Sequence, residues 1–261
     1  MHRRSSRLLM VAGLVAGLVV PLLAAPVSAT PAKDPAVIGR RVIGTSVQGR
    51  DVVAYHLGEP GRPDADTVVL LSTMHGDEPD TRDILRALID GPEVIGLDLW
   101  VVPTYNPDGY ARRTRQNGRG VDLNRNFPEN WRPLDGRYES GPRPASEPET
   151  RAMMAFLKQV DPDWILSFHQ PLNGVDTDTK DPAFARRVAR VLELPTTRLD
   201  CRGTCHGTLT QWFNARFDGV ALTVEYDANP SRRRMRVVAP DQVLRIFHAV
   251  RGYVGAEPLS G

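Results

Sequence analysis

The amino-acid sequence predicts a single α/β domain with a mixed, largely parallel central sheet that helices flank on both faces. Segments with helical spacing separate strand-like runs, and this alternation is typical of a parallel sheet covered on both sides. Strands that are buried on both faces are apolar throughout. Four such runs occur, at 67–73, 98–103, 164–168 and 220–224. Most of the 261 residues follow an N-terminal segment, and this length suits one large domain better than two small ones.

Local signals predict the other elements. The runs RVIGTSV and DVVAYHL flank a short turn at 48–50, which favours a β-hairpin. Pro79 can occupy the first position of a helix that follows the strand 67–73. The segment 105–143 is crowded with Asn, Gly, Pro and Arg, and an aperiodic loop of that length is usually functional. Further helices are predicted at 147–160, 182–192 and 241–253.

The N-terminus has the features of a secretory signal peptide. Basic residues at positions 3, 4 and 7 precede a long apolar run, and the small residues Val27 and Ala29 follow it. This pattern predicts a signal peptide over 1–29 with cleavage after Ala29. An uncleaved membrane anchor is the alternative because the run approaches spanning length, but Gly and Pro residues interrupt it. We expect a protein that is secreted or held at the cell envelope, without stable membrane insertion after cleavage.

The segment 30–40 is rich in Pro and Ala and is interpreted as a linker, which leaves 41–261 as the folded domain. Charge indicates no nucleic-acid partner, because the formal net charge is only +2 and the basic residues are spread along the chain. The dense cluster at 232–234 is short and is typical of a solvated turn.

The two cysteines, Cys201 and Cys205, lie in the sequence CRGTCH. This spacing does not fit a haem attachment site, which needs two residues between its cysteines. In an oxidising compartment we expect a short-range disulfide that shapes a loop, with free thiols as the alternative.

Metal-binding residue types follow two of the buried strands. His75 and Glu78 come after the strand 67–73, and His169 comes after the strand 164–168. In parallel sheets, groups just beyond the strand ends face the functional crevice. Two histidines and one glutamate, with a fourth position left to water, make a catalytic zinc site. The H-x-x-E spacing alone is a weak signal, and a structural role at a strand end is the alternative for His169.

A catalytic zinc site also needs a base for proton transfer, and a carboxylate is the usual choice. Glu225 follows the strand 220–224 and is the candidate. The alternative is that its charge only marks where the strand meets solvent. Three strand ends thus carry candidate metal ligands or the candidate general base, which favours a catalytic site at this edge of the sheet.

The segment 106–128, NPDGYARRTRQNGRGVDLNRNFP, is the most specific stretch. Together with the H-x-x-E of His75 and Glu78, and with His169 and Glu225 after later strands, this segment resembles the zinc metallocarboxypeptidases. The resemblance extends over about 67–254. The resemblance implies a zinc carboxypeptidase-like catalytic domain with one Zn²⁺ ion. It also implies the site residues: zinc ligands His75, Glu78 and His169; Arg115 for the carbonyl oxygen; Asn124 and Arg125 for the substrate's terminal carboxylate; and Glu225 as general base and then acid.

Two features depart from the digestive members of that family. They place a tyrosine between the third ligand and the glutamate, whereas this chain has none between His169 and Glu225. Tyr226 adjoins Glu225 but would face the opposite way on a strand, so no catalytic tyrosine is assigned. The chain is also shorter, and it is more similar to the small bacterial branch, which includes murein peptide amidases that cleave γ-D-glutamyl-diaminopimelate bonds.

By the same analogy, the segment 200–212 would line the specificity side of the pocket. His206, Thr208 and Thr210 are candidates for contact with the substrate side chain. The two threonines could equally open the helix that follows them.

The expected function is therefore that of a secreted zinc metallocarboxypeptidase, which acts on peptides with a free C-terminal carboxylate. Cell-wall (murein) peptides are a candidate substrate. Deacylases of the aspartoacylase and succinylglutamate desuccinylase type are an alternative, since they share H-x-x-E, NP and DLNR segments, but they act on small N-acyl amino acids. An inactive binding module of the same fold is a second alternative.

Overall fold

The computed structural model describes residues 36–199 and 203–252. Its main sheet has eight strands in the order β1-β2-β5-β3-β6-β9-β7-β8. Their bounds are β1 Val37–Thr45, β2 Asp51–Gly58, β3 Thr67–Ser72, β5 Asp98–Val102, β6 Trp164–His169, β7 Leu172–Asp176, β8 Thr196–Thr197 and β9 Val220–Asp227. The short strands β4 (Val94–Ile95) and β10 (Val250–Arg251) form a separate pair.

The four central strands β5, β3, β6 and β9 are parallel to one another, and these are the four predicted apolar runs. The β1–β2 hairpin joins one side of them and β7 joins the other, both in antiparallel pairing. The predicted mixed, largely parallel sheet is confirmed. Because β3, β6 and β9 run the same way, the residues at their carboxyl ends meet at one edge of the sheet.

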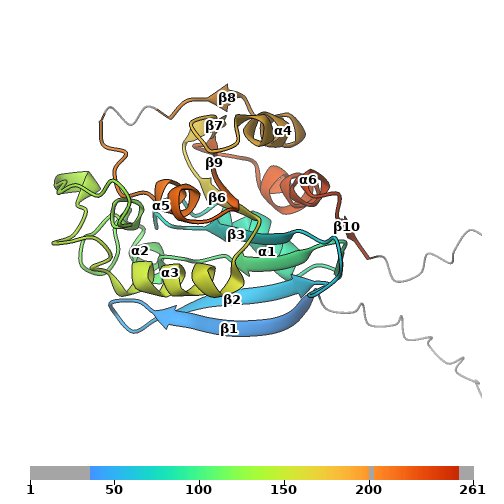
Figure 1. Ribbon diagram of the computed structural model, residues 1–261, viewed down its shortest axis with the longest axis horizontal. Coiled ribbons are helices and arrows are strands. Elements are labelled where there is room, and N and C mark those ends of the chain that lie inside the picture. The colour runs from blue at the N-terminus through green and yellow to red at the C-terminus, as the bar shows by residue number, and fades with distance from the viewer. Residues whose placement is uncertain (1–35, 200–202, 253–261) are drawn as a thin grey trace, which may run out of the picture. The chain divides into compact units, whose positions relative to one another are not determined.

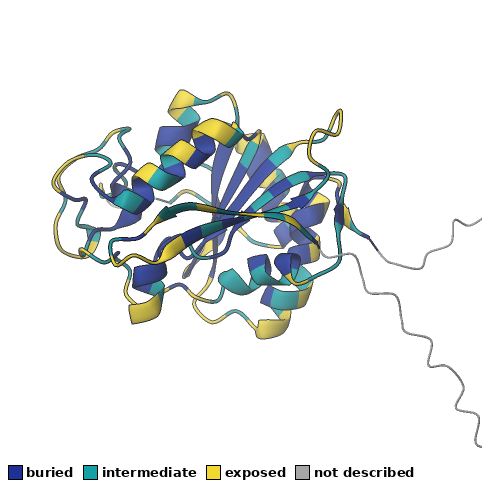
Figure 2. Ribbon diagram, turned by 90° about the horizontal axis from the view of Figure 1, so that it is seen from below, coloured by how far each residue is buried: buried dark blue, intermediate teal, exposed yellow. Residues whose placement is uncertain are grey.

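Helices cover both faces of the sheet, as predicted (Figure 1). One core lies between the sheet and the helices α1, α4 and α6, and the other lies between the sheet and α3 and α5. Figure 2 shows the strands as a buried layer between helices whose outer sides are exposed. The helix bounds are α1 Arg82–Ile89, α2 Pro107–Arg112, α3 Pro148–Val160, α4 Pro182–Leu192, α5 Leu209–Arg216 and α6 Ala239–Ile246.

Three predicted boundaries are wrong. α1 begins at Arg82 rather than at Pro79, because the chain from Pro79 first forms a tight turn in which Arg82 N–H donates to Pro79 O. α6 ends at Ile246 rather than at 253, because the backbone reverses at His248 (φ +57°) and then pairs with β4. The linker predicted over 30–40 ends earlier, because β1 is already paired with β2 from Val37.

The predicted signal peptide over 1–29 lies outside the described residues, and so does Cys201 of the expected disulfide. Within the described part of the chain, no helix is both long and apolar enough to cross a membrane.

Candidate active site

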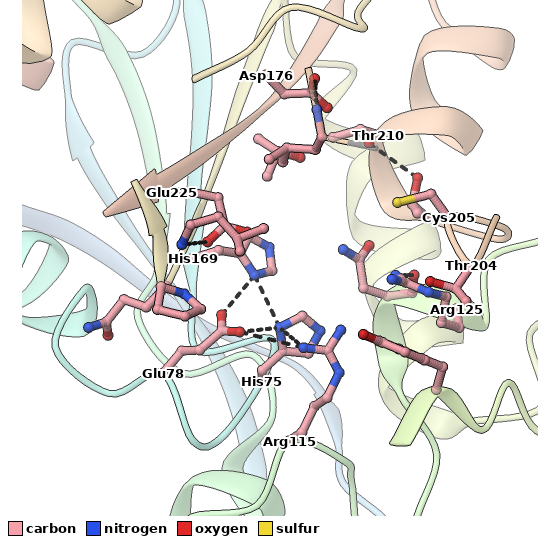
Figure 3. A pocket seen from close by; sticks show the side chains of 18 of the residues that line it. His75, Glu78, Arg115, Arg125, His169, Asp176, Thr204, Cys205, Thr210 and Glu225 are labelled. Carbon is pink, nitrogen blue, oxygen red and sulfur yellow. Dashed lines mark hydrogen bonds and ion pairs between the residues drawn. The ribbon is translucent and has the colours of Figure 1, made fainter. Parts of the chain in front are cut away.

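His75, Glu78 and His169 converge at the edge of the sheet where β3 and β6 end (Figure 3). All three are buried, and each offers one ligand atom within 4.8 Å of the others. The Glu78 carboxylate lies between the two rings: its Oε1 is 2.7 Å from His75 Nδ1, and its Oε2 is 2.9 Å from His169 Nδ1. The structure therefore brings together the three side chains that were predicted as metal ligands.

A close packing of two loops holds the His75–Glu78 turn in place. A Cβ atom at Gly76 would lie 1.9 Å from the backbone carbon of Gly109, so only glycine fits there. Asn106 caps α2 by accepting from Gly109 N–H, and its Nδ2 donates to Met74 O and to Arg115 O. The NPDG turn thus ties the metal-ligand turn to the segment that carries Arg115.

The donor set fits zinc. Two imidazole nitrogens and one carboxylate are the protein ligands of many catalytic zinc sites. Both histidines direct Nδ1 inward, while each Nε2 has an outer partner: Asp122 Oδ1 at 3.1 Å from His75 and Ser167 Oγ at 2.9 Å from His169. Burial alone would raise the pKa of the Glu78 carboxyl, but His75 and His169 outweigh burial and hold it below its usual value. Glu78 is therefore an anion, as metal coordination requires.

Asp122 is a site residue that the sequence analysis did not single out. It is fully buried, and its Oδ2 accepts from the Arg115 guanidinium at 2.8 Å while its Oδ1 faces His75. Burial opposes its negative charge, but His75 and Arg115 outweigh burial and hold the pKa of Asp122 below its usual range. A carboxylate in this position fixes the orientation of a metal-binding imidazole.

Replacing Asp122 with asparagine is expected to weaken zinc binding by about 10- to 100-fold, the usual effect of losing such a partner. The amide preserves the size of the side chain but removes the charge that orients His75. Zinc affinity can be measured by competition with a chromophoric chelator. A variant that binds zinc as tightly as the wild type would contradict the assigned role.

The charged side chains of the segment 105–143 also reach the site. Arg115 Nη1 lies 3.2 Å from His75 Nδ1 and 3.6 Å from Glu78 Oε1. Asn124 and Arg125 lie on a short 3₁₀-helix, η1 (Leu123–Arg125), whose capping residue is Asp122. Arg125 is only 4% exposed, its Nη1 donates to Asn124 O, and its Nε has no hydrogen-bond partner among the described residues.

A cavity of about 590 Å³ joins these groups. It is lined by the three predicted metal ligands, by Arg115, Asn124 and Arg125, and by Glu225, Thr208 and Thr210. Its volume is in the range of small-molecule sites. The predicted ligands, carboxylate-binding residues and base therefore share one cavity.

Glu225 lies on β9 next to the end of β6, where it is paired in register with His169. It is 7% exposed, and its Oε2 accepts from Leu172 N–H at 3.3 Å. Burial raises the pKa of its carboxyl, against the opposing effect of His169. Tyr226 faces the opposite side of the sheet, where its ring packs near Phe168, as the strand alternation predicted.

The specificity segment is only partly as predicted. His206 is not among the described residues that line the cavity. Thr208 and Thr210 line it, but Thr208 also caps α5, since its Oγ1 accepts from Gln211 N–H at 3.1 Å. The capping alternative for Thr208 is confirmed, and a capping side chain can still present its methyl group to the cavity.

Tyr138 is the second residue that sequence reasoning missed. It lies on the 3₁₀-helix η2 (Gly136–Tyr138) and lines the cavity. The guanidinium carbons of Arg115 and Arg125 lie 5.4 and 5.2 Å from the centroid of its ring. Such contacts stabilise a desolvated cation, so this ring supports both arginines at once.

Comparisons with known proteins point to one family. The family model described as zinc carboxypeptidase matches residues 27–172. The murein peptide amidase A of Escherichia coli K12 is 32% identical over 171 residues, which are 60% of this chain and 69% of that protein.

Solved structures share the fold. The murein-tripeptide amidase from Escherichia coli O157 is 26% identical with a TM-score of 0.67, over 83% of this chain and 93% of the other. A carboxypeptidase A from Helicoverpa armigera, at 16% identity and a TM-score of 0.65, covers 82% of this chain and 68% of its own. The family model spans more than half of the sequence, and the chain is therefore a metallopeptidase that belongs to the zinc carboxypeptidase family.

Proposed function

We propose that this chain is an exported, zinc-dependent carboxypeptidase that hydrolyses the bond to a C-terminal residue, with cell-wall peptides as its substrates. The observation that carries the proposal is the shared cavity. The three candidate metal ligands, Arg125 and Glu225 all line it, so one substrate can contact all of them. The similarity to murein peptide amidase A supports the choice of cell-wall peptides. The predicted signal peptide supports export to the compartment where such peptides occur.

Arg125 and Asn124 provide the site for the substrate's terminal carboxylate. A guanidinium offers parallel N–H donors in a planar fork, which matches a carboxylate. Burial lowers the pKa of the Arg125 guanidinium, so this cation gains from an anionic ligand that replaces lost water. Arg125 and Asn124 both line the cavity that also holds the candidate metal ligands.

Glu225 would carry the proton during hydrolysis. Its Oε2 is already engaged by Leu172 N–H, so we assign proton transfer to Oε1. There it would take a proton from the attacking water and later deliver it to the leaving amine. Burial raises the pKa of the carboxyl, and a base whose pKa is nearer to the working pH also returns the proton more readily as an acid.

When bound by His75, Glu78 and His169, a zinc ion supplies the Lewis acid that polarises a carbonyl and lowers the pKa of water. Arg115 lies beside that group and can donate to the oxygen on which negative charge develops. Asp122 and the ring of Tyr138 hold its guanidinium in position.

Matched peptides test the proposed function. The wild-type protein is expected to release the last residue of muropeptides and of linear peptides that end in a free carboxylate, and to leave the same peptides intact when they are C-terminally amidated. A chelator should abolish release, and added zinc should restore it. Products can be identified by liquid chromatography and mass spectrometry.

Three results would contradict the proposal. Cleavage of amidated peptides at the same rate would exclude the role of Arg125. Release from N-acyl amino acids but not from peptides would favour a deacylase. Absence of zinc from the purified protein, together with no hydrolysis on zinc addition, would favour a binding module.

A further inference from the structure

Two like charges of the active site lie against one aromatic ring. Arg115 and Arg125 both line the cavity, and their guanidinium carbons lie 5.4 and 5.2 Å from the centroid of the Tyr138 ring. The Arg115 side chain is 12% exposed and Arg125 is buried, so water screens their mutual repulsion poorly. Burial and the charge of Arg115 together lower the pKa of the Arg125 guanidinium, against the opposing effect of Asp122. The protein therefore has to hold two repelling cations close together.

The two guanidinium groups differ in the groups that face them. Arg115 forms ion pairs with Asp122 at 2.8 Å and with Glu78 at 3.6 Å. Arg125 forms no direct ion pair with a described residue, and its Nη1 donates to the carbonyl of the adjacent Asn124. The negative face of an aromatic ring attracts a cation, most strongly in a desolvated site. The ring of Tyr138 thus gives Arg125 a favourable contact in place of a direct ion pair.

Hydrogen bonds fix the segment that carries this ring. On one side of the tyrosine, Gly136 O accepts from Gln116 Nε2 at 2.7 Å. On the other side, Glu139 O accepts from Asp122 N–H at 2.7 Å. Gln116 directly follows Arg115, and the carboxylate of Asp122 binds the Arg115 guanidinium. The ring is therefore attached to the same segment as Arg115, and no contact with a substrate is needed to place it.

We propose that Tyr138 is a positioning residue whose ring holds Arg115 and Arg125 together, so that both engage one substrate at the same time. The inference rests on the proposed function, which assigns the carbonyl oxygen to Arg115 and the terminal carboxylate to Arg125. Without the ring, mutual repulsion would move Arg125, which lacks a direct ion pair, away from Arg115. Displaced donors of this kind lower both substrate binding and the rate of the chemical step.

Two substitutions separate the ring from the hydroxyl. Tyr138→Phe preserves the ring and should keep kcat/KM within about 3-fold of the wild type for a peptide with a free C-terminal carboxylate. Tyr138→Leu keeps an apolar side chain without a π face and should lower kcat/KM by about 10- to 100-fold, the loss expected for two cation–π contacts in a desolvated site. A higher KM reports the displacement of Arg125, and a lower kcat reports that of Arg115.

The alternative is that the ring only fills space, and a fluorinated series decides between the two roles. Mono-, di- and trifluorinated phenylalanines at position 138 weaken the negative face of the ring step by step and hardly change its shape. The logarithm of kcat/KM should fall with each added fluorine, whereas equal values across the series would overturn the inference. Tyr110→Leu is the matched control, since Arg82 lies 5.1 Å from the Tyr110 ring and neither residue lines the cavity. This variant should keep kcat/KM.

The outcomes distinguish this inference from the proposed function. If the wild type cleaves peptides and Tyr138→Leu cleaves them equally well, the inference is overturned and the proposed function stands. If the wild type cleaves no peptide, the proposed function fails, and calorimetry on the zinc-loaded protein then compares binding of one peptide with binding of its C-terminal amide. Tighter binding of the free carboxylate, kept in Tyr138→Phe and lost in Tyr138→Leu, would still support the inference. The absence of this preference in the wild type, or its persistence in Tyr138→Leu, would overturn it.

Discussion

Replacing Glu225 with glutamine is expected to lower kcat by about 10²- to 10⁴-fold, the range typical of general acid–base groups. Glutamine is nearly isosteric, and its side-chain oxygen can still accept from Leu172 N–H, but it cannot take a proton from water at neutral pH. Zinc content should not change because Glu225 is not one of the three convergent ligand side chains. The measurement is kcat together with zinc stoichiometry on the same protein sample.

The stability of the same variant distinguishes a catalytic defect from a folding defect. Burial raises the pKa of the Glu225 carboxyl in the folded protein, so the folded state binds this proton more tightly than the unfolded state does. The carboxyl therefore favours folding in its protonated form, and this contribution is lost as the pH rises through the ordinary glutamate range and then through the raised pKa. In the metal-free protein at neutral pH, the glutamine variant should melt at least as high as the wild type. Near-normal turnover with zinc bound would exclude Glu225 as the base.

The parts of the fold and site that the sequence predicts are those with local signals. β3, β6 and β9 each contain a buried, mainly apolar run because helices cover both faces of the sheet, and each such run is recognisable by itself. Parallel neighbours end at the same edge, so His169 and Glu225 could be expected to lie together, and the register pairs them directly.

Asp122 and Tyr138 could not be assigned in this way, because both lie in the aperiodic segment 105–143. Asp122 owes its role to a contact with His75, 47 residues earlier in the chain, and Tyr138 owes its role to two arginines. No periodicity predicts such contacts. Asp122 stands within the DLNR run and could have been suspected there, whereas Tyr138 has no comparable sequence signal.

The sequence analysis assigned the contacts with the substrate side chain to the segment 200–212. In the structure, this part of the cavity also depends on the pairing of β7 with β9. His206 was chosen for its residue type, yet it does not line the part of the cavity that the structure describes. Asp176, which lines the cavity, was not chosen because it ends β7, a short strand with few apolar residues. Its position became apparent only from the pairing of β7 with β9.

The charged side chains that surround the cavity partly compensate one another. Glu78 is balanced by His75 and His169, Asp122 is balanced by His75 and Arg115, and the ring of Tyr138 supports Arg115 and Arg125. Burial and the neighbouring Arg115 both disfavour the positive charge of Arg125, and Asp122 opposes them. Under the proposed function, the terminal carboxylate of the substrate would add a second negative charge beside Arg125.

Replacing Glu78 with glutamine is expected to abolish both zinc binding and hydrolysis. Glu78 is the only anion among the three convergent side chains, and its two oxygens bridge His75 Nδ1 and His169 Nδ1. The amide keeps the volume but lacks the charge that favours a divalent cation, so zinc affinity should fall by more than the roughly 10- to 100-fold typical of losing an outer partner such as Asp122. Zinc stoichiometry after dialysis measures this loss directly.

Thermal unfolding gives an independent measure of the same event, because a ligand that binds only the folded state stabilises it. Zinc at 1,000 times its dissociation constant should stabilise the wild type by about 4 kcal/mol, and the same zinc concentration should leave the melting temperature of Glu78→Gln almost unchanged. Asp77→Asn is the matched control: Asp77 is adjacent in the chain, is exposed, and contacts Arg137 at 3.6 Å. If Asp77→Asn lost the zinc-dependent shift and Glu78→Gln kept it, the ligand assignment would be wrong. Loss of the shift in Glu78→Gln alone would locate the ion between β3 and β6.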